Sequence, residues 1–224
     1  MDERYCSPKS EARVRGCQQL SEQRRIVNKR PYQMRDRAEQ VSRTRRRIVE
    51  ATVHLHTSIG LAATTVAGIA QQAGVTRLTV YRHFPDVEQL YAACKEHWLA
   101  QQVQPDVASW ARTVDPADRL RLGLSDLYRF YRGGEAMLTN VDRDREILPE
   151  DVRQSNEGTD AHLRDVLLQP FAARGARRRR LKAVLGHAVK FATWRSLCVE
   201  QELSDREAVE TMTELALATA GPDR

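Results

Sequence analysis

The segment from residue 65 to residue 84, TVAGIAQQAGVTRLTVYRHF, constrains the fold more than any other part of the chain. It begins with Thr65, whose hydroxyl can accept a backbone N–H at the start of a helix. Apolar residues then recur at helical spacing, at Val66, Ile69, Ala70 and Ala73. Gly74 follows directly, and a residue without a Cβ can take the left-handed conformation that ends a helix. The spacing predicts a short amphipathic helix over 65–73 that ends in a tight turn.

The second half of the segment predicts another short helix. Thr76 can cap its first turn, and Val80 and Phe84 are spaced to point inward. The outward side chains are then polar, aromatic or cationic, namely Arg77, Thr79, Tyr81, Arg82 and His83. Two helices joined by a short glycine turn match the helix-turn-helix layout, in which the second helix enters the major groove of DNA. An ordinary buried helical hairpin can show the same Ala-Gly-Val turn, so the turn alone leaves both interpretations open.

The residues that follow make the pattern more specific. YRHFP at 81–85 and EQLY at 88–91 closely resemble the signature that closes the DNA-binding domain of the TetR family. GLAATTVAGI at 60–69 resembles the usual beginning of the same motif, and the resemblance covers about residues 44–98 without an insertion. It implies a sequence-specific, DNA-binding transcriptional regulator. The family commonly has lysine where this chain has Val87, so the phosphate contact that the resemblance assigns to that position is expected to be missing.

Within this domain the outward side chains are the candidate DNA contacts. We expect Arg77, Thr79 and Arg82 at base edges or phosphates. The side chains expected mainly at phosphates are Thr65, Thr76, Tyr81 and His83. Tyr81 has a second interpretation, in which its ring packs on the first helix of the domain and only its hydroxyl lies outside.

The positive charge is concentrated at the beginning of the chain. Lys and Arg number 36 against 30 Asp and Glu, but residues 1–47 hold 14 of these cations and only 6 of the anions. The segment ends in RTRRR at 43–47, where arginines such as Arg45 can neutralise phosphates or enter a minor groove. For residues 1–33 a solvated, disordered tail is the preferred interpretation. Met34 offers an alternative start, because the family normally has only a short arm before its first helix.

Beyond residue 84 the chain is predicted to be helical throughout. No segment alternates convincingly at period two, and a charged stretch at 142–158, interrupted by Pro149, is expected to be a mobile connection. The main helices are expected at 86–102, 159–173, 176–199 and 204–219. The predicted fold is all-α, with an N-terminal three-helix helix-turn-helix domain and a C-terminal helical regulatory and dimerisation domain. The expected limits are a basic extension at 1–40, a DNA-binding domain at 41–86, and a ligand-binding and dimerisation domain at 87–220.

The last two predicted helices carry broad apolar stripes. One stripe comprises Leu181, Val184, Leu185, Ala188, Phe191, Ala192 and Leu197, and the other comprises Ala208, Val209, Met212, Leu215, Ala216 and Thr219. Pairing two copies would bury both stripes, but they could equally complete the core of one chain. One helix-turn-helix reads few base pairs, whereas a twofold dimer reads two half-sites about 34 to 36 Å apart or a multiple of that. We therefore expect a homodimer through about 181–199 and 204–219 on a palindromic double-stranded DNA operator, as the resemblance also implies.

The chain offers no motif for catalysis. It has no nucleophile with a base, paired carboxylates, phosphate-binding glycine loop or metal-ligand spacing above chance, so we predict no enzyme, no metal and no cofactor. The cysteines are expected to be free thiols, at Cys6, Cys17, Cys94 and Cys198. The absence of an apolar run of about 18 residues and of an apolar leader predicts a cytoplasmic protein that does not associate with membranes.

The C-terminal region does contain side chains that could line a cavity for an unidentified small-molecule effector. These candidates are Trp110, Tyr128, Tyr131, Met137, His162, Phe171, Phe191 and Trp194. For most of them a place in the ordinary core is the preferred interpretation. The predicted function is a ligand-released repressor in which helix 86–102 transmits the change to the DNA-binding domain. The alternative is a ligand-independent or architectural regulator with a filled C-terminal core.

Overall fold

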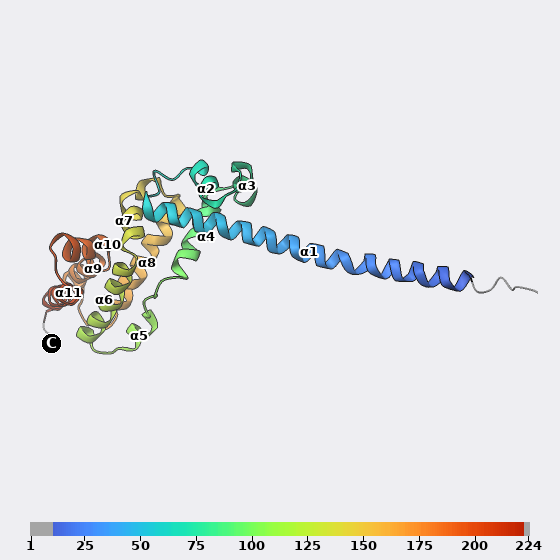
Figure 1. Cartoon of the computed structure of the whole chain (residues 1–224). Helices are drawn as coiled ribbons and strands as arrows, with labels where there is room; N and C mark the ends of the chain where they lie inside the picture. The colour runs from blue at the N-terminus through green and yellow to red at the C-terminus, as the bar shows by residue number, and fades with distance from the viewer. Residues whose placement is uncertain (1–10, 222–224) are drawn as a thin grey trace, which may run out of the picture. The chain divides into compact units, whose positions relative to one another are not determined.

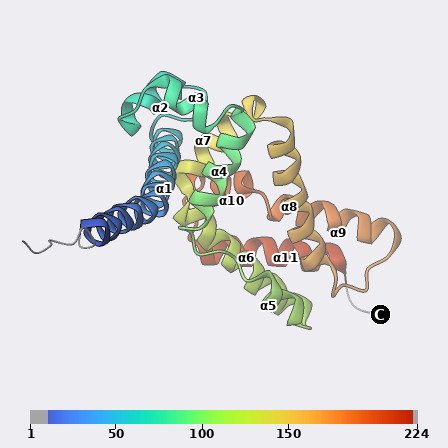
Figure 2. The ribbon, with the colours of Figure 1, turned by 90° about the vertical axis from the view of Figure 1, so that its right-hand side faces the viewer.

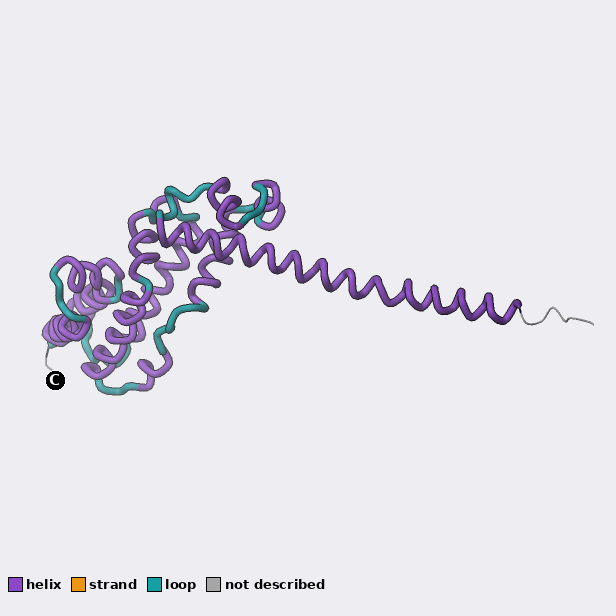
Figure 3. Tube along the Cα trace, in the orientation of Figure 1, coloured by secondary structure: helices purple, strands orange, loops and turns teal. Residues whose placement is uncertain are grey.

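The computed structural model describes residues 11–221, with side chains from residue 34 onward. Within that range every regular element is a helix, as Figures 1 and 3 show, and this confirms the all-α prediction. The chain divides into two units, Met1–Arg47 and Ile48–Arg224, which are described separately.

The first unit contains most of helix α1 (Glu11–Ser58), which has 48 residues and continues into the second unit. The sequence favoured a disordered tail over 1–33, whereas the structure is helical from Glu11 onward; residues 1–10 lie outside the described range. Arg, Glu and Gln dominate residues 11–33, and these residues have high helix propensity. The limit at residue 40 stays a prediction.

The second unit begins with the helix-turn-helix domain, which comprises α1 from Ile48 onward, α2 (Val66–Ala73), α3 (Arg77–His83) and the start of α4 (Val87–Leu99). The domain has its own small core, in which the inward residues of all four helices meet. Its buried members are Ile48, Val49, Ala51, Ile69, Ala70, Ala73, Val80, Phe84, Leu90 and Cys94. This core fixes which side of α3 faces away from the protein.

The C-terminal domain follows α4 and consists of α5 to α11. Its helices are α5 (Val107–Arg112), α6 (Pro116–Gly133), α7 (Glu135–Arg143), α8 (Glu150–Leu168), α9 (Gly175–Ala188), α10 (Phe191–Arg195) and α11 (Asp205–Ala220). Helix α11 packs on α6 and α9, and α9 also packs on α8 (Figure 2). The side chains completely buried between them include Trp110, Tyr128, Leu167, Leu181 and Trp194.

Two expected boundaries in this domain were wrong. The stretch 142–158, expected to be a mobile connection, contains a short 3-10 helix (Arg145–Ile147) and the first half of α8. Pro149 immediately precedes α8, a position that needs no intrahelical N–H, and Glu150 and Asp151 favour the positive end of the helix dipole. The single helix expected at 176–199 is instead broken after Ala188 and ends in a π-helical turn (Ser196–Glu200).

Two helices of the C-terminal domain begin with side-chain caps. Ser204 and Glu207 form a capping box at the start of α11, with the Glu207 carboxylate accepting the Ser204 backbone N–H at 2.8 Å. Asp115 caps α6 by accepting the Asp118 backbone N–H at 2.8 Å, with Pro116 as the first helical residue.

Candidate nucleic-acid interface

The turn between α2 and α3 has the predicted geometry. The Thr65 hydroxyl accepts the backbone N–H of Gly68 at 3.1 Å and caps α2. Gly74 ends α2 with φ 63° and ψ 42°, which lies in the left-handed region. Thr76 then caps α3 by accepting the Thr79 backbone N–H at 3.2 Å. The prediction of two short helices around a glycine turn is therefore confirmed.

Helix α3 presents most of the predicted contact residues to solvent. Val80 and Phe84 are buried, as predicted, whereas Arg77, Tyr81 and Arg82 are exposed. Thr79 and His83 are half-buried at the edges of the exposed face. Tyr81 is 53% exposed, which favours the outward interpretation of its ring over packing on α1. The exposed face of α3 is thus cationic and aromatic in character.

One exposed residue of α3 was missed in the sequence. Leu78 is 76% exposed, more than any other large apolar residue of this domain. It lies one turn before Arg82 and opposite the inward pair Val80 and Phe84. Helical spacing from that inward pair identifies the position, but the predicted contacts comprise only polar and aromatic side chains.

The threonine hydroxyls have defined partners within the protein. The Thr76 and Thr79 hydroxyl oxygens lie 2.9 Å apart in a hydrogen bond, and the hydroxyls of Thr65 and Thr76 also serve as helix caps. These threonines therefore shape the turn, and their contacts to phosphates or bases stay a prediction. Arg45 lies on the exposed part of α1 in the first unit.

Val87 is the first residue of α4 and is 54% exposed. The residue before it, Asp86, accepts a hydrogen bond from the Gln89 side chain at 2.6 Å, which fixes the local turn. An exposed apolar side chain at a helix N-terminus offers no charge to a phosphate. The position is therefore open, and it lacks the cation that the family resemblance associates with it.

The helix-turn-helix domain is connected to the C-terminal domain by contacts from α7 as well as through α4. The Asn140 side-chain amide donates hydrogen bonds to the backbone carbonyls of His56 and Thr57, each at 2.9 Å. The Asp144 carboxylate accepts the backbone N–H of Ala62 at 3.0 Å. Gly60 has φ +92°, and a Cβ at this position would collide with the Arg143 guanidinium. The end of α7 thus holds the connection between α1 and α2 closely.

The same junction contains a buried histidine. The His56 ring stacks on the Tyr91 ring of α4 with centroids 5.4 Å apart. Burial lowers the pKa of His56 to about 4, although the nearby Asp144 carboxylate opposes the shift. The Arg143 guanidinium and backbone N–H donors hold the pKa of Asp144 well below its usual range. His56 is therefore neutral and Asp144 charged at neutral pH.

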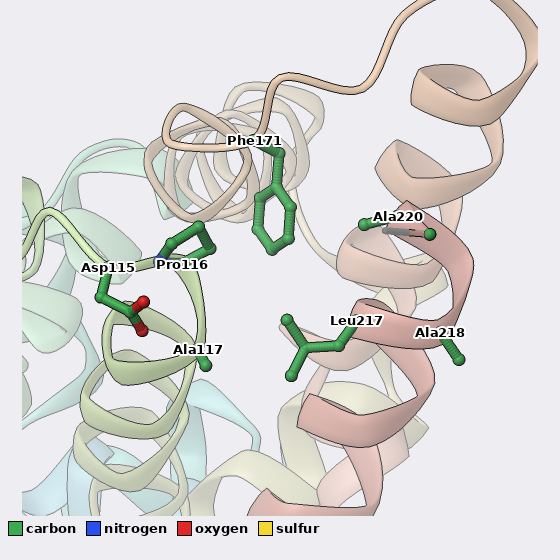
Figure 4. A pocket seen from close by; sticks show the side chains of 8 residues that line it. Asp115, Pro116, Ala117, Phe171, Leu217, Ala218 and Ala220 are labelled. Atoms are coloured by element: carbon green, nitrogen blue, oxygen red, sulfur yellow. The ribbon is translucent and has the colours of Figure 1, made fainter. Parts of the chain in front are cut away.

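A cavity of about 430 Å³ opens at the far end of the C-terminal domain (Figure 4). It lies between the start of α6, the connection from α8 to α9, and the end of α11. Its lining is mostly apolar and consists of Asp115, Pro116, Ala117, Phe171, Leu217, Ala218, Ala220 and Gly221.

Of the eight residues proposed to line a cavity, Phe171 lines this one, and the structure places the other seven elsewhere. Trp110, Tyr128, Tyr131, Met137 and Trp194 are buried in the protein, Phe191 is half-buried, and His162 is exposed. Their polar tips bind protein atoms where they are buried. The Trp110 indole N–H donates to Asp126 at 3.0 Å, and the Tyr131 hydroxyl donates to the Val189 carbonyl at 2.6 Å. These aromatic residues are part of the packed core, and their hydrogen-bonding groups find partners within it.

Most of the two apolar stripes expected at a dimer interface are also buried within one chain. The buried members are Leu181, Leu185, Ala188, Ala208, Val209, Met212 and Ala216. They complete the core of the C-terminal domain, which was the alternative interpretation of the pattern. The outer faces of α9 and α11 remain exposed, with Ala183 on α9 and Leu215, at 48% exposure, on α11.

None of the helices between residues 11 and 221 is long and apolar enough to cross a bilayer. The described residues contain no cluster of three or more His, Cys, Asp or Glu side chains that could hold a metal ion. Cys94 and Cys198 are buried free thiols, and burial raises the pKa of Cys94 to about 12. The side chains of Cys6 and Cys17 lie outside the described range.

The sequence of the helix-turn-helix domain has known relatives. Residues 48–94 match the family model described as bacterial regulatory proteins, tetR family. Over 86 residues the chain is 35% identical to the HTH-type transcriptional regulator SrpR of Pseudomonas putida, a match that covers 36% of this chain and 40% of SrpR. The identity to the uncharacterized HTH-type transcriptional regulator TtgW, also of Pseudomonas putida, is 35% over 86 residues, and the match covers 36% of this chain and 64% of TtgW. Both matches thus span less than two thirds of the relative.

Solved structures share the fold over a larger part of the chain. A TetR-like transcriptional regulator from Rhodococcus sp. RHA1 superposes with a TM-score of 0.54 at 18% identity, covering 77% of this chain and 93% of that one. NalD, described as the secondary repressor of the MexAB-OprM multidrug efflux pump in Pseudomonas aeruginosa, gives a TM-score of 0.52 at 19% identity, covering 80% and 96%. A putative fatty acid metabolism regulator from Clostridium perfringens gives a TM-score of 0.52 at 18% identity, covering 77% and 97%. At such identities the similarity extends to the fold alone.

Proposed function

Because this chain is a TetR family protein, with the family's DNA-binding domain at residues 48–94, we propose that it is a transcriptional repressor released from DNA by a small molecule. It binds a palindromic operator as a homodimer. The observation that carries the proposal is the outward face of α3, where Arg77 and Arg82 are exposed while Val80 and Phe84 anchor the helix in the core. A short helix held in this way after a tight turn suits insertion into the major groove.

Charge on the outer faces of α9 and α11 supports the homodimer. The first turns of α9 carry four consecutive exposed arginines at 177–180, and cations at a helix N-terminus oppose the helix dipole. Helix α11 carries Glu214 on its exposed side, whereas Glu207 and Glu210 already bind Ser204 and Arg121 of their own chain. If α9 of one chain packs against α11 of the other, these opposite charges come together at the edge of the interface. Such pairing would offset the cost of placing four cations at the positive end of a helix.

The cavity beside Phe171 supports an effector. Its volume of about 430 Å³ lies in the range that small-molecule sites occupy. An effector that prefers one arrangement of the C-terminal helices shifts the equilibrium between arrangements, and DNA and effector then weaken each other's binding by the same factor. The proposed route to the DNA-binding domain runs through α4 and through the hydrogen bonds of Asn140 and Asp144 at the end of α7.

The basic part of α1 is proposed to add attraction that does not depend on sequence. The arginines at 43–47, including Arg45, neutralise phosphates or enter a minor groove beside the operator. Their contribution should fall steeply as the salt concentration rises.

Selection of bound fragments from genomic DNA tests the proposed function. The full chain should enrich fragments that share an inverted repeat, with half-sites about 34 to 36 Å apart or a multiple of that. Sedimentation equilibrium should give twice the mass of one chain at the concentrations that bind this DNA. A matched protein with Arg77 and Arg82 both replaced by alanine should enrich nothing. Equal recovery of all sequences by the two proteins would contradict sequence-specific regulation.

Replacing Val87 by lysine should strengthen operator binding, because it supplies a cation at an exposed position that lacks one. The slope of log K against log salt concentration should steepen by about 0.9 for each additional phosphate that is neutralised. Fluorescence anisotropy with the selected DNA at several salt concentrations measures both effects. The control is Val114→Lys, since Val114 is 85% exposed between α5 and α6. If the slope steepens equally in both variants, the added net charge, and not its position at residue 87, causes the effect.

A further inference from the structure

Leu78 is the most exposed large apolar residue of the helix-turn-helix domain. The predicted DNA contacts of α3 do not include it. The core fixes the orientation of α3 through Val80 and Phe84, which are 2% and 3% exposed. Leu78 lies on the opposite side and is 76% exposed. Helix α3 does not need the side chain for stability, because Leu78 lies outside the cluster of residues that forms the domain core.

Resting on the proposed function, we infer that Leu78 determines operator sequence by contacting the 5-methyl group of a thymine in the major groove. Among the groups that base pairs present there, the thymine methyl is the apolar one, and apolar side chains recognise it. Leu78 is the second residue of α3, and the N-terminal residues of a recognition helix are those that reach base edges. The contact removes two apolar surfaces from water together.

The neighbours of Leu78 favour this occupant over a protein surface. Arg77 precedes it and Arg82 follows one turn later, both exposed, so the leucine is surrounded by cations that suit a polyanion. The Thr79 hydroxyl, which could otherwise read a base edge beside it, is hydrogen-bonded to the Thr76 hydroxyl at 2.9 Å. Leu78 is therefore the exposed apolar side chain of this otherwise cationic and aromatic face.

Replacement of thymine by uracil tests the inference, because it deletes one methyl group and leaves base pairing unchanged. Each thymine of the selected operator is replaced in turn, and the affinity of the full chain is measured by fluorescence anisotropy. At one thymine of each half-site, uracil should weaken binding about fourfold, the factor that corresponds to burial of one methyl group. The same replacement should leave the affinity of the Leu78→Ala variant unchanged.

Wild type and Leu78→Ala, each measured on thymine and uracil DNA, form a double-mutant cycle, and two further variants are its controls. Val114→Ala, which shortens an exposed apolar side chain outside the DNA-binding domain, should keep the full response to uracil. Leu78→Met should also keep it, because the side chain stays long and apolar. An equal loss on uracil DNA for wild type and Leu78→Ala, or no response at any thymine, would overturn the inference alone. Failure to select any operator would overturn the proposed function and this inference with it.

Discussion

Replacing Arg77 by alanine should weaken operator binding by about 1 to 3 kcal/mol per half-site and should relax the preference at one base pair. Arg77 is the first residue of α3 and is exposed, so its guanidinium can reach a guanine edge and donate two hydrogen bonds. The fold should persist, because alanine favours a helix and the arginine side chain is not part of the core. Binding to the selected operator and to all single-base variants at one base pair measures both the loss and the change in preference.

Arg112→Ala is the matched control, since Arg112 is an exposed arginine at the end of α5 and its replacement changes the net charge equally. It should leave both affinity and preference close to those of the wild type. A loss in Arg77→Ala that is the same on every DNA sequence would assign Arg77 to a phosphate rather than to a base. The salt slope would then fall by about 0.9 per half-site, which gives a second measure of that outcome.

The local structure of the DNA-binding domain was predictable because each of its determinants lies within a few residues in sequence. Thr65 and Thr76 cap helices through the backbone N–H three residues later, and Gly74 ends α2 by its own conformation. The exposure of Leu78 follows from the same helical spacing as the burial of Val80. This part of the site needed no knowledge of tertiary contacts.

The C-terminal domain was less predictable because inward-facing residues serve two purposes. Tyr128 and Trp194 have the spacing of cavity-lining aromatic residues, but a filled core requires the same spacing. Leu181 and Met212 likewise fit both a dimer interface and the core of one chain, and the structure places them in the core. The distinction depends on which helices are neighbours, and periodicity does not contain that information.

The junction between the domains depends on contacts across a long sequence separation. Asn140 binds the carbonyl of His56, 84 residues earlier, and Asp144 binds the N–H of Ala62, 82 residues earlier. The sequence indicated α4 as the helix that transmits a change, because it is the covalent connection. The contacts of α7 add a second proposed route. A displacement of α7 would reach the DNA-binding domain through these contacts without any bending of α4.

The stability of the protein should fall by about 2 kcal/mol between pH 7.5 and pH 5 on account of His56 alone. Burial of the ring, which stacks on Tyr91, lowers its pKa from 6.5 to about 4. The unfolded chain therefore binds a proton more readily than the folded protein between these two values. The contribution of neutral His56 is fully present above pH 6.5 and is lost as the pH falls toward 4. Asp144 facing the ring keeps its charge throughout this range, because the pKa of its carboxyl is held below the usual value.

Urea denaturation at pH 7.5, 6 and 5 isolates this effect when the wild type is compared with His56→Phe. Phenylalanine retains an aromatic ring to stack on Tyr91 but does not titrate. Between pH 7.5 and pH 5 the free energy of unfolding of the wild type should therefore fall by about 2 kcal/mol more than that of the variant. His162→Phe makes the same change at an exposed histidine and should keep the wild-type pH dependence. Parallel curves for wild type and His56→Phe would mean that His56 titrates normally in the folded protein. The hydrogen bonds of Asn140 and Asp144 would then have to hold a solvated junction rather than a buried one.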